Sequence, residues 1–285
     1  MTYFLEGELS ASERDPQTAK FRVIPVPLER TVSYGAGTAD GPDAILEASV
    51  ELERLFRNAE PCKHGIVTDD YVDCTGPLPD VMERIAGRTE MAVKAGAVPV
   101  TLGGEHALSY GAVRGVVRGL GRDVGIVQID AHADLRKAYQ GERHSHASVM
   151  QLLAEEDGIR IAQFGVRALC TEEANRRADC GIFYRDAEEL VTQNISAVDL
   201  PADFPQDIYV SFDVDGLDPS ILPATGTPVP GGLGYYQALN LVRHALKGRR
   251  LVGFDVVELA PRKDSAVSDF TTAQITYAIM EMADS

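Results

Sequence analysis

Short runs of apolar, largely β-branched residues alternate along the chain with longer segments whose apolar residues recur at helical spacing. This alternation is typical of repeated βα units around a mostly parallel sheet. We expect eight buried or half-buried strands. They are predicted at Lys20–Pro27, His64–Asp70, Val98–Leu102, Val124–Asp130, Arg160–Val166, Gly181–Tyr184, Asp207–Asp213 and Arg250–Glu258.

Five helices are expected between these strands, and no internal repeat or linker rich in Pro, Gly or Ser divides the chain. We therefore predict an α/β fold, with residues 1–285 forming a single three-layer α/β/α domain. Two glycine-rich stretches that follow strands, Leu28–Gly41 and Gly216–Gly234, are candidate walls of a functional site. The helices are predicted at Pro42–Phe56, Pro79–Ala97, Ala107–Arg118, Tyr235–Leu246 and Ser268–Met282.

Composition places the chain among ordinary folded proteins, with 45% hydrophobic and 25% charged residues over 285 positions. Its first residues lack the basic end and apolar run of a secretory signal, and no stretch is long enough to span a membrane. A cytoplasmic protein is therefore expected. The four cysteines form no CxxC pair, which argues against structural zinc and disulfides. A net charge of −16 disfavours nucleic-acid binding.

Acidic residues and histidines gather where predicted strands end. Asp130, His132 and Asp134 follow one apolar strand, and alternation along an extended chain points all three toward one side. Asp213 and Asp215 close another strand with the same spacing. Each motif alone commonly faces solvent, so their combination carries the argument.

Two further strand ends add His106 and Glu258 to this group. Because the carboxyl ends of parallel strands form a crevice, four strands deliver polar groups to one place. Four aspartates buried together would be strongly unfavourable without cations. Carboxylates and imidazoles without a thiolate favour Mn²⁺, with Fe²⁺, Co²⁺, Ni²⁺ or Zn²⁺ as substitutes. Five or six ligands exceed the needs of one catalytic ion, so two ions with a bridging hydroxide are expected.

These residues resemble those of the ureohydrolase family, which comprises arginases and agmatinases. The central matches are G-G-E-H at Gly103–His106, D-A-H-A-D at Asp130–Asp134 and S-F-D-V-D-G-L-D-P at Ser211–Pro219. The resemblance extends over almost the whole chain. Its other segments are S-Y-G-A-G-T-A-D-G-P at Ser33–Pro42, S-H-A-S at Ser145–Ser148, G-T-P-V-P-G-G-L at Gly226–Leu233 and D-V-V-E at Asp255–Glu258.

The resemblance implies an arginase-like fold, two Mn²⁺ per chain, and a trimer or hexamer. Asp130 and Asp213 would bridge the ions, Glu258 would pair with a substrate guanidinium, and His146 would shuttle protons. His146 lies in the S-H-A-S motif just before an expected helix, whereas His144 lies further back in the loop. Thr227 is a further candidate substrate contact. The implied ligands are His106, Asp130, Asp134 and Asp213 for one ion, and Asp130, His132, Asp213 and Asp215 for the other.

The implied reaction is hydrolysis of a guanidine to urea and an amine. The stretch from Leu135 to Ser148 is similar to agmatinases, and Arg136 and Lys137 count against arginase, so we predict agmatine as substrate and putrescine as product. The positive charge of Arg136 would instead repel the terminal amine of agmatine and favour a guanidino acid. Alternatives are therefore 4-guanidinobutyrate, 3-guanidinopropionate, arginine and formimidoylglutamate.

Cys170 occupies the position where arginases hold the substrate amino group with an acidic residue, and Glu172 or Glu173 could replace that residue. Two other classes of function are remote. A di-metal phosphoesterase should supply basic residues or a glycine-rich nest for phosphate, whereas this chain places Glu258 at the site. A non-catalytic homologue should have lost ligands, and all six are present.

Overall fold

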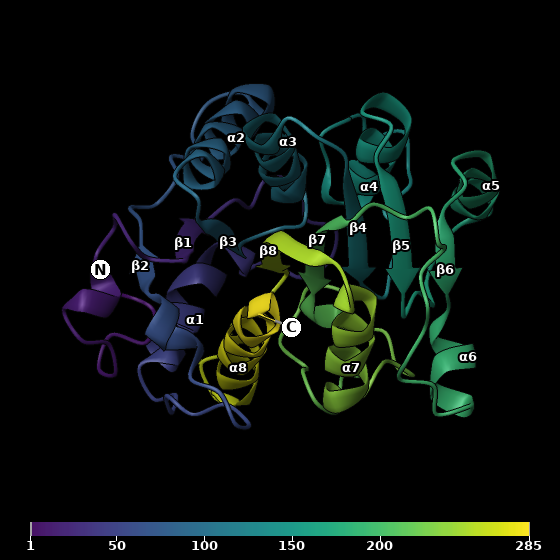
Figure 1. Cartoon of the computed structure of the whole chain (residues 1–285). Coiled ribbons are helices and arrows are strands. Elements are labelled where there is room, and N and C mark those ends of the chain that lie inside the picture. Colours follow the sequence, from purple (N-terminus) through teal and green to yellow (C-terminus); the bar gives the residue numbers. More distant parts are fainter. Residues whose placement is uncertain (1, 285) are drawn as a thin grey trace.

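One sheet runs through the centre of the molecule (Figure 1), and its described strands are all parallel. The computed structural model describes residues 2–284. The eight predicted strands are all present, each within two residues of its expected ends. They are β1 (Phe21–Val26), β2 (Ile66–Thr68), β3 (Val98–Gly103), β4 (Val124–Ile129), β5 (Arg160–Phe164), β6 (Phe183–Arg185), β7 (Asp207–Asp213) and β8 (Arg250–Val257).

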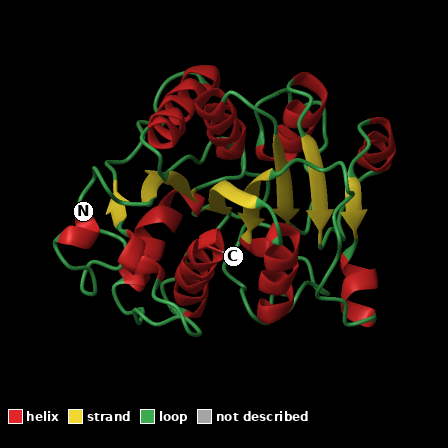
Figure 2. Cartoon of the chain, viewed as in Figure 1, coloured by secondary structure: helices red, strands yellow, loops and turns green. Residues whose placement is uncertain are grey.

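Helices cover both faces of this sheet (Figures 1 and 2), which confirms the predicted α/β/α layering. One face carries α2 (Leu78–Lys94), α3 (Leu108–Leu120) and α4 (Val149–Gln151). The other carries α1 (Gly41–Ser49), α7 (Tyr235–Leu246) and α8 (Val267–Glu281). Helices α5 (Thr171–Asp179) and α6 (Ala187–Thr192) flank the edge at β6. Shorter helical segments are Ser12–Arg14, Thr38–Asp40, Pro61–His64, His146–Ser148, Leu152–Glu156, Val214–Gly216 and Met282–Asp284.

All five predicted helices are present, but one is shorter than expected. Helix α1 ends at Ser49, whereas the apolar pattern predicted a helix as far as Phe56. The chain makes turns instead: the N–H groups of Glu51 and Leu52 donate to the carbonyls of Ala48 and Ser49, and further on Phe56 pairs with Ala59. The helix expected just after His146 is the short α4, which begins at Val149, whereas α5 and α6 were not predicted. They are short, and α5 is largely polar, so neither length nor apolar spacing indicated them.

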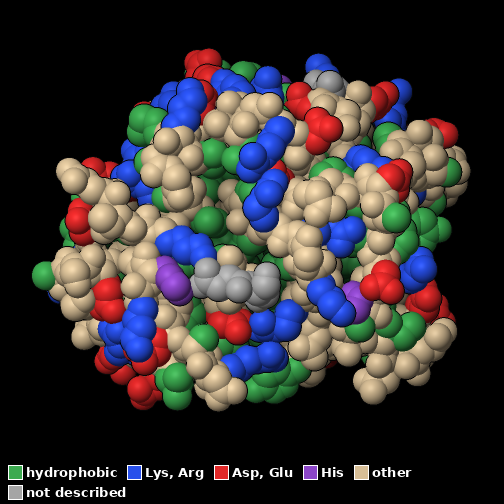
Figure 3. All heavy atoms as spheres, in the orientation of Figure 1, with side chains coloured by type: hydrophobic (Ala, Val, Ile, Leu, Met, Phe, Trp, Pro, Cys, Tyr) green, Lys and Arg blue, Asp and Glu red, His purple; other side chains and the backbone are tan. Residues whose placement is uncertain are grey.

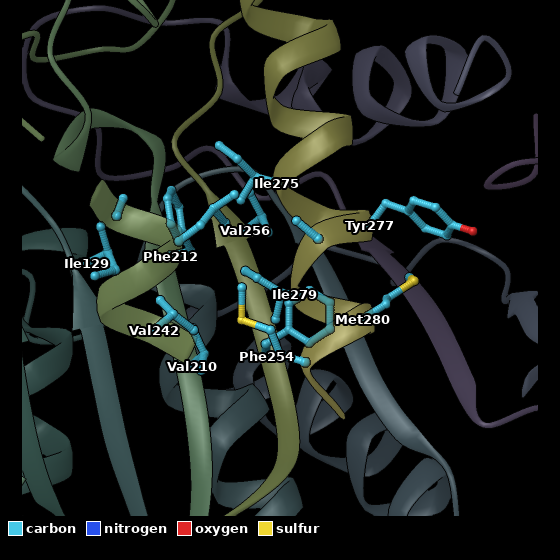
Figure 4. Close-up of a cluster of buried hydrophobic side chains, with 14 of the residues drawn as sticks. Ile129, Val210, Phe212, Val242, Phe254, Val256, Ile275, Tyr277, Ile279 and Met280 are labelled. Carbon is cyan, nitrogen blue, oxygen red and sulfur yellow. The ribbon is translucent and has the colours of Figure 1, made fainter. Parts of the chain in front are cut away.

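The central strands are fixed by large apolar side chains between the sheet and helices α7 and α8 (Figure 4). Phe212 of β7 and Phe254 of β8 have no exposed surface, and Val242 of α7 and Ile279 of α8 are also fully buried. Full burial of a side chain of this size contributes roughly 1.5–3 kcal/mol. Strands β7 and β8 are therefore held firmly where their carboxyl ends deliver polar groups.

The strand order is β2-β1-β3-β8-β7-β4-β5-β6. The chain builds one half of the sheet through β3 and then crosses to the other half to form β4, before β7 and β8 fill the middle. Strands β3, β8, β7 and β4 consequently lie next to one another. A reversal of strand order of this kind leaves a crevice at the carboxyl edge of the sheet.

Within residues 2–284, no helix has the length and apolar composition that a membrane crossing requires. On the face shown in Figure 3, Lys and Arg side chains are interspersed with Asp and Glu side chains. Charges of both signs are thus distributed over that face, although the chain carries a net charge of −16.

The N-terminal segment is attached to the domain through Arg54. Its Nη2 lies 2.7 Å from Oε1 of Glu13 and its Nε lies 3.2 Å from Oε2 of Glu60. Nη1 also donates to the carbonyl of Glu8. The hydrogen bond from Arg54 favours the ionised form of Glu13 and lowers the pKa of that carboxyl to about 2.

We expect Glu13→Gln to lower the melting temperature at pH 7 by about 1–4 °C, because an ion pair is lost. The pKa of Glu13 is lowered in the folded state, so its stabilising effect is complete above its ordinary value of 4.5 and is lost toward pH 2. The difference between variant and parent, measured by thermal denaturation, should therefore narrow from pH 5 to pH 3. Exposed Glu51 provides the control variant, Glu51→Gln. A pH-independent difference for Glu13→Gln would contradict this assignment.

Candidate metal centre

Side chains from the ends of four adjacent strands meet at one cavity of about 400 Å³. The strands are β3, β4, β7 and β8. Asp130 is fully buried next to the other predicted residues rather than on the cavity surface. The predicted residues that line the cavity are His106, His132, Asp134, His146, Asp213, Asp215, Thr227 and Glu258.

Two groups of side chains in this site could each hold a metal ion. The first consists of His106, Asp130 and Asp134, and the second of Asp130, His132 and Asp215. Asp130 therefore belongs to both groups. Nδ1 of His132 lies 3.0 Å from Oδ2 of Asp215 and 3.6 Å from Oδ1 of Asp130.

Asp213 lies beside the first group. Its Oδ2 is 3.3 Å from Nδ1 of His106, and its Oδ1 accepts the backbone N–H of Asp215 at 2.8 Å. Only 3% of Asp213 is exposed. The carboxylate is thus fixed at one oxygen and directed toward His106 with the other.

The geometry around His106 fits a cation. Among the described residues its buried Nδ1 has no well-directed hydrogen bond, although oxygens of Asp134, Asp130 and Asp213 lie 2.9, 3.2 and 3.3 Å away. A lone pair surrounded by carboxylate oxygens repels them, whereas a divalent ion between them would be bound by all.

The other ring nitrogen of His106 is fixed by a buried polar chain. The hydroxyl of Ser211 donates to Oδ1 of Asp255 at 2.9 Å, and Tyr209 donates to Oδ2 of the same carboxylate at 2.8 Å. Oγ of Ser211 is 2.8 Å from Nε2 of His106. Because the only hydroxyl proton of Ser211 goes to Asp255, its oxygen must accept a proton from Nε2. Nε2 of His106 therefore keeps its proton, and Nδ1 is the nitrogen that can give up its proton to bind a cation.

The pKa values of the site residues also indicate an excess of negative charge that cations would neutralise. Burial and the neighbouring Asp130 raise the pKa of Asp134 to about 7. Burial and repulsion from Asp215 and Asp130 raise the pKa of Asp213 well above its usual range. Burial lowers the pKa of His132, but Asp130 and Asp215 outweigh it and raise that pKa to about 12. Without cations, the site thus retains protons that bound metal ions would displace.

Glu258 and Asp134 both have left-handed backbones, with φ of 66° and 53°. This conformation is uncommon for residues other than glycine and is often held in place at functional sites. Glu258 is held by two hydrogen bonds: its N–H donates to the carbonyl of Gly104 at 2.9 Å, and its Oε1 accepts the N–H of His106 at 2.6 Å. Strand ends β3 and β8 are thereby joined at the cavity.

The two glycine-rich loops contribute walls of the cavity, as the sequence predicted. Val32, Tyr34 and Thr227 are among their cavity-lining residues. The first loop approaches β3 so closely that a Cβ at Gly104 would lie 2.0 Å from the carbonyl oxygen of Leu28. Only glycine fits that contact.

Arg167, which sequence reasoning did not single out as a site residue, holds the second loop in place. Its guanidinium donates to the carbonyls of Asp215, Leu217 and Val229 at 2.7, 3.1 and 2.7 Å. The residue follows the end of β5, but no local pattern in the sequence indicates that its partners lie in a different loop.

The cavity also contains an acidic and a basic side chain outside the metal-capable groups. Glu173 is only 4% exposed, and its oxygens accept the N–H groups of Leu135 and Cys170 at 3.2 and 2.9 Å. Nε of Arg136 lies 3.9 Å from Oε2 of Glu173. Of the two predicted alternatives, Glu173 lines the cavity, whereas Glu172 is exposed and pairs with Arg176. Both glutamates lie in the first turn of α5.

The two neighbouring histidines occupy different environments. His146 lines the cavity, and burial together with repulsion from His106 and His132 lowers its pKa to about 4. His144 packs against Tyr110, with a ring-centroid distance of 5.5 Å. It is half-buried and lies outside the cavity lining.

Comparisons with known proteins agree with this geometry. Residues 19–282 match the family model described as Arginase family. The chain is 36% identical to N(1)-aminopropylagmatine ureohydrolase of Synechocystis sp., covering 97% of this chain and 92% of that protein. It is 31% identical to agmatinase of Pyrococcus horikoshii, covering 94% of each. The structure of agmatine ureohydrolase of Thermoplasma volcanium superposes with a TM-score of 0.85 at 26% identity, covering 100% of this chain and 94% of that one. The chain therefore belongs to the arginase family.

Proposed function

We propose that this protein hydrolyses the guanidino group of agmatine, releasing urea and putrescine. The observation that carries the proposal is the position of Glu258, a buried carboxylate in the same cavity as two metal-capable groups. Similarity to an agmatinase and to an aminopropylagmatine ureohydrolase supports a substrate of this class.

The two metal-capable groups are proposed to hold two divalent ions, with Asp130 in both groups and Asp213 beside the first. Carboxylates and imidazoles without a thiolate suit Mn²⁺. When bound, such ions supply a water of lowered pKa and neutralise developing negative charge. The chain's own contribution is to fix the ligand atoms, as Ser211 does for His106.

Glu258 is proposed to receive the guanidinium of the substrate. A planar cation with several N–H donors suits a carboxylate, and the backbone N–H of His106 already fixes Oε1 of Glu258. Burial raises the pKa of this carboxyl to about 8 in the chain without cations. An entering guanidinium favours the ionised form of Glu258, so binding of the substrate is coupled to release of the proton from this carboxyl.

His146 is proposed to transfer the proton that the departing amine requires. It lines the cavity and is held by Thr31 and by an edge-on contact with Tyr139, with ring centroids 5.3 Å apart. The lowered pKa of about 4 gives a ring that is neutral at pH 7 and able to accept a proton before donating it. Thr227, whose hydroxyl donates to Asp215 at 3.3 Å, is a proposed substrate contact on the opposite loop.

The tail of the substrate is proposed to lie beside Glu173. This carboxylate is buried in the cavity and would attract the terminal amine of agmatine. Arg136 counteracts that attraction and would favour a guanidino acid, but 40% of its side chain is exposed, so solvent screens its charge more strongly.

A second candidate substrate is N(1)-aminopropylagmatine, an extended form of agmatine. The relative at 36% identity carries that name. In addition, Tyr34 lines the cavity while 88% of it is exposed, which leaves an uncovered aromatic surface for a longer tail. Both candidates share the guanidine and a cationic tail, and N(1)-aminopropylagmatine differs by an added aminopropyl group.

We expect the chain, loaded with Mn²⁺, to release urea from agmatine or N(1)-aminopropylagmatine with a higher kcat/KM than from 4-guanidinobutyrate or arginine. Glu173→Gln should raise KM for the cationic substrates about 10-fold, because one charge-assisted contact is lost. The amide oxygen of glutamine can still accept the N–H of Cys170 at the helix cap, whereas its amide nitrogen cannot accept the N–H of Leu135. Arginine as the best substrate, or no urea from any of these compounds with metal bound, would contradict the proposal.

Asp130→Asn is expected to reduce the metal content from two ions per chain to less than one, because a shared ligand loses its charge. Metal content is measured by elemental analysis after dialysis against Mn²⁺ and then metal-free buffer. Asp69→Asn is the matched control, since Asp69 follows β2 of the same sheet but pairs with Arg22 outside the cavity. Two ions retained by Asp130→Asn would refute its role in both groups.

His146→Ala is expected to lower kcat by roughly 10- to 10⁴-fold with the metal content unchanged, because general acid–base catalysis is lost. His144→Ala should reduce kcat much less, since that ring packs against Tyr110 outside the cavity. Steady-state kinetics and metal analysis of both variants test this. Equal kcat values for the two variants, or metal loss from His146→Ala alone, would reverse the assignment.

A further inference from the structure

Glu105 is a fully buried carboxylate that neither metal-capable group uses. It belongs to the G-G-E-H segment and immediately precedes His106. Its Oε2 accepts the backbone N–H groups of Arg30 and Thr31, both at 2.7 Å, and its Oε1 accepts the hydroxyl of Thr31 at 2.9 Å. The three contacts are all donors, which suits a carboxylate that only accepts.

Thr31 connects this carboxylate to His146. Oγ1 of Thr31 lies 3.0 Å from the backbone nitrogen of His146 and 3.1 Å from its Nδ1. A threonine hydroxyl has one proton and two lone pairs, and the hydroxyl of Thr31 donates its only proton in the hydrogen bond to Glu105. Oγ1 must therefore accept both contacts from His146, so Nδ1 carries a proton.

We propose that Glu105, acting through Thr31, is a positioning residue that keeps His146 in the tautomer with its proton on Nδ1. The lone pair is then on Nε2, the nitrogen left to exchange protons with the cavity. The catalytic consequence rests on the proposed function, in which His146 transfers a proton, whereas the tautomer itself does not.

The arrangement is rigid enough to select one orientation of the ring. The N–H of Glu105 donates to the carbonyl of Leu28 at 2.7 Å, which joins the G-G-E-H turn to the loop that carries Thr31. The ring of Tyr139 restricts the His146 ring from another side. A flipped ring would lose its hydrogen bond to Thr31 and leave the half-buried hydroxyl oxygen of Thr31 without that partner.

A double-mutant cycle tests the catalytic consequence. Thr31→Val keeps the shape of the side chain but removes the hydroxyl, and we expect kcat to fall about 10-fold or more with KM and metal content little changed. Thr31→Ser should restore kcat. In a His146→Ala background, Thr31→Val should change kcat less than about 2-fold, because the residue through which it acts is gone.

Thr38→Val is the matched control, because Thr38 lies in the same loop and its hydroxyl donates to a different carboxylate, Glu29, at 3.0 Å. Any effect of Thr38→Val should be the same with or without His146. If Thr31→Val lowers kcat equally in the parent and His146→Ala backgrounds, its role is structural and the proposal is wrong.

The tautomer is measured independently of turnover by ¹⁵N NMR of the histidine-labelled chain, loaded with Zn²⁺ to avoid paramagnetic broadening. The chain has six histidines, and His146→Ala identifies the resonances of His146. We expect a proton on Nδ1 in the parent and a loss of that preference in Thr31→Val. A proton on Nε2 in the parent overturns the proposal. An Nδ1 proton in a chain that releases no urea would support the positioning role while removing the proposed function.

Discussion

Mutual repulsion among buried carboxylates is the constraint on which the rest of this structure depends. Asp130, Asp134, Asp213 and Asp215 meet at the ends of β4 and β7, in a space that water does not reach freely. Such a group is strongly unfavourable unless cations or protons neutralise part of its charge and hydrogen-bond donors satisfy the remaining oxygens. Asp130 accepts from the side chain of Gln128 and the N–H of His132, at 2.7 and 2.6 Å. The firmly packed central strands provide the necessary rigidity.

The same device orients two histidines in opposite ways. In each case a buried carboxylate accepts a hydrogen bond from a hydroxyl group, and the oxygen of that hydroxyl then accepts a hydrogen bond from an imidazole N–H. Asp255 and Ser211 act on Nε2 of His106, which frees Nδ1 toward the carboxylates. The corresponding chain from Glu105 reaches Nδ1 of His146. A hydroxyl between the carboxylate and the ring thus fixes which ring nitrogen carries the proton, without placing another charge beside the imidazole.

Much of this fold and site was predictable because both follow local rules. The eight strands have apolar runs of the expected length, and spacing of two residues at a strand end indicates which side chains share a side. The contacts behind the site were not predictable in this way. Thr31 and Glu105 are 74 positions apart, and Ser211 and Asp255 are 44 apart, so no local pattern joins them. The choice between Glu172 and Glu173 likewise depended on α5, whose polar sequence gave no helical signal.

Asp130 belongs to both metal-capable groups, and this sharing has a thermodynamic consequence. Two ions that draw on one carboxylate are not independent ligands of the protein. Occupancy of either group would change the charge available to the other, so loading becomes a linked equilibrium with a reciprocal coupling free energy. Free-metal concentration would then govern both the fraction of fully loaded chains and the resistance of the fold to heat.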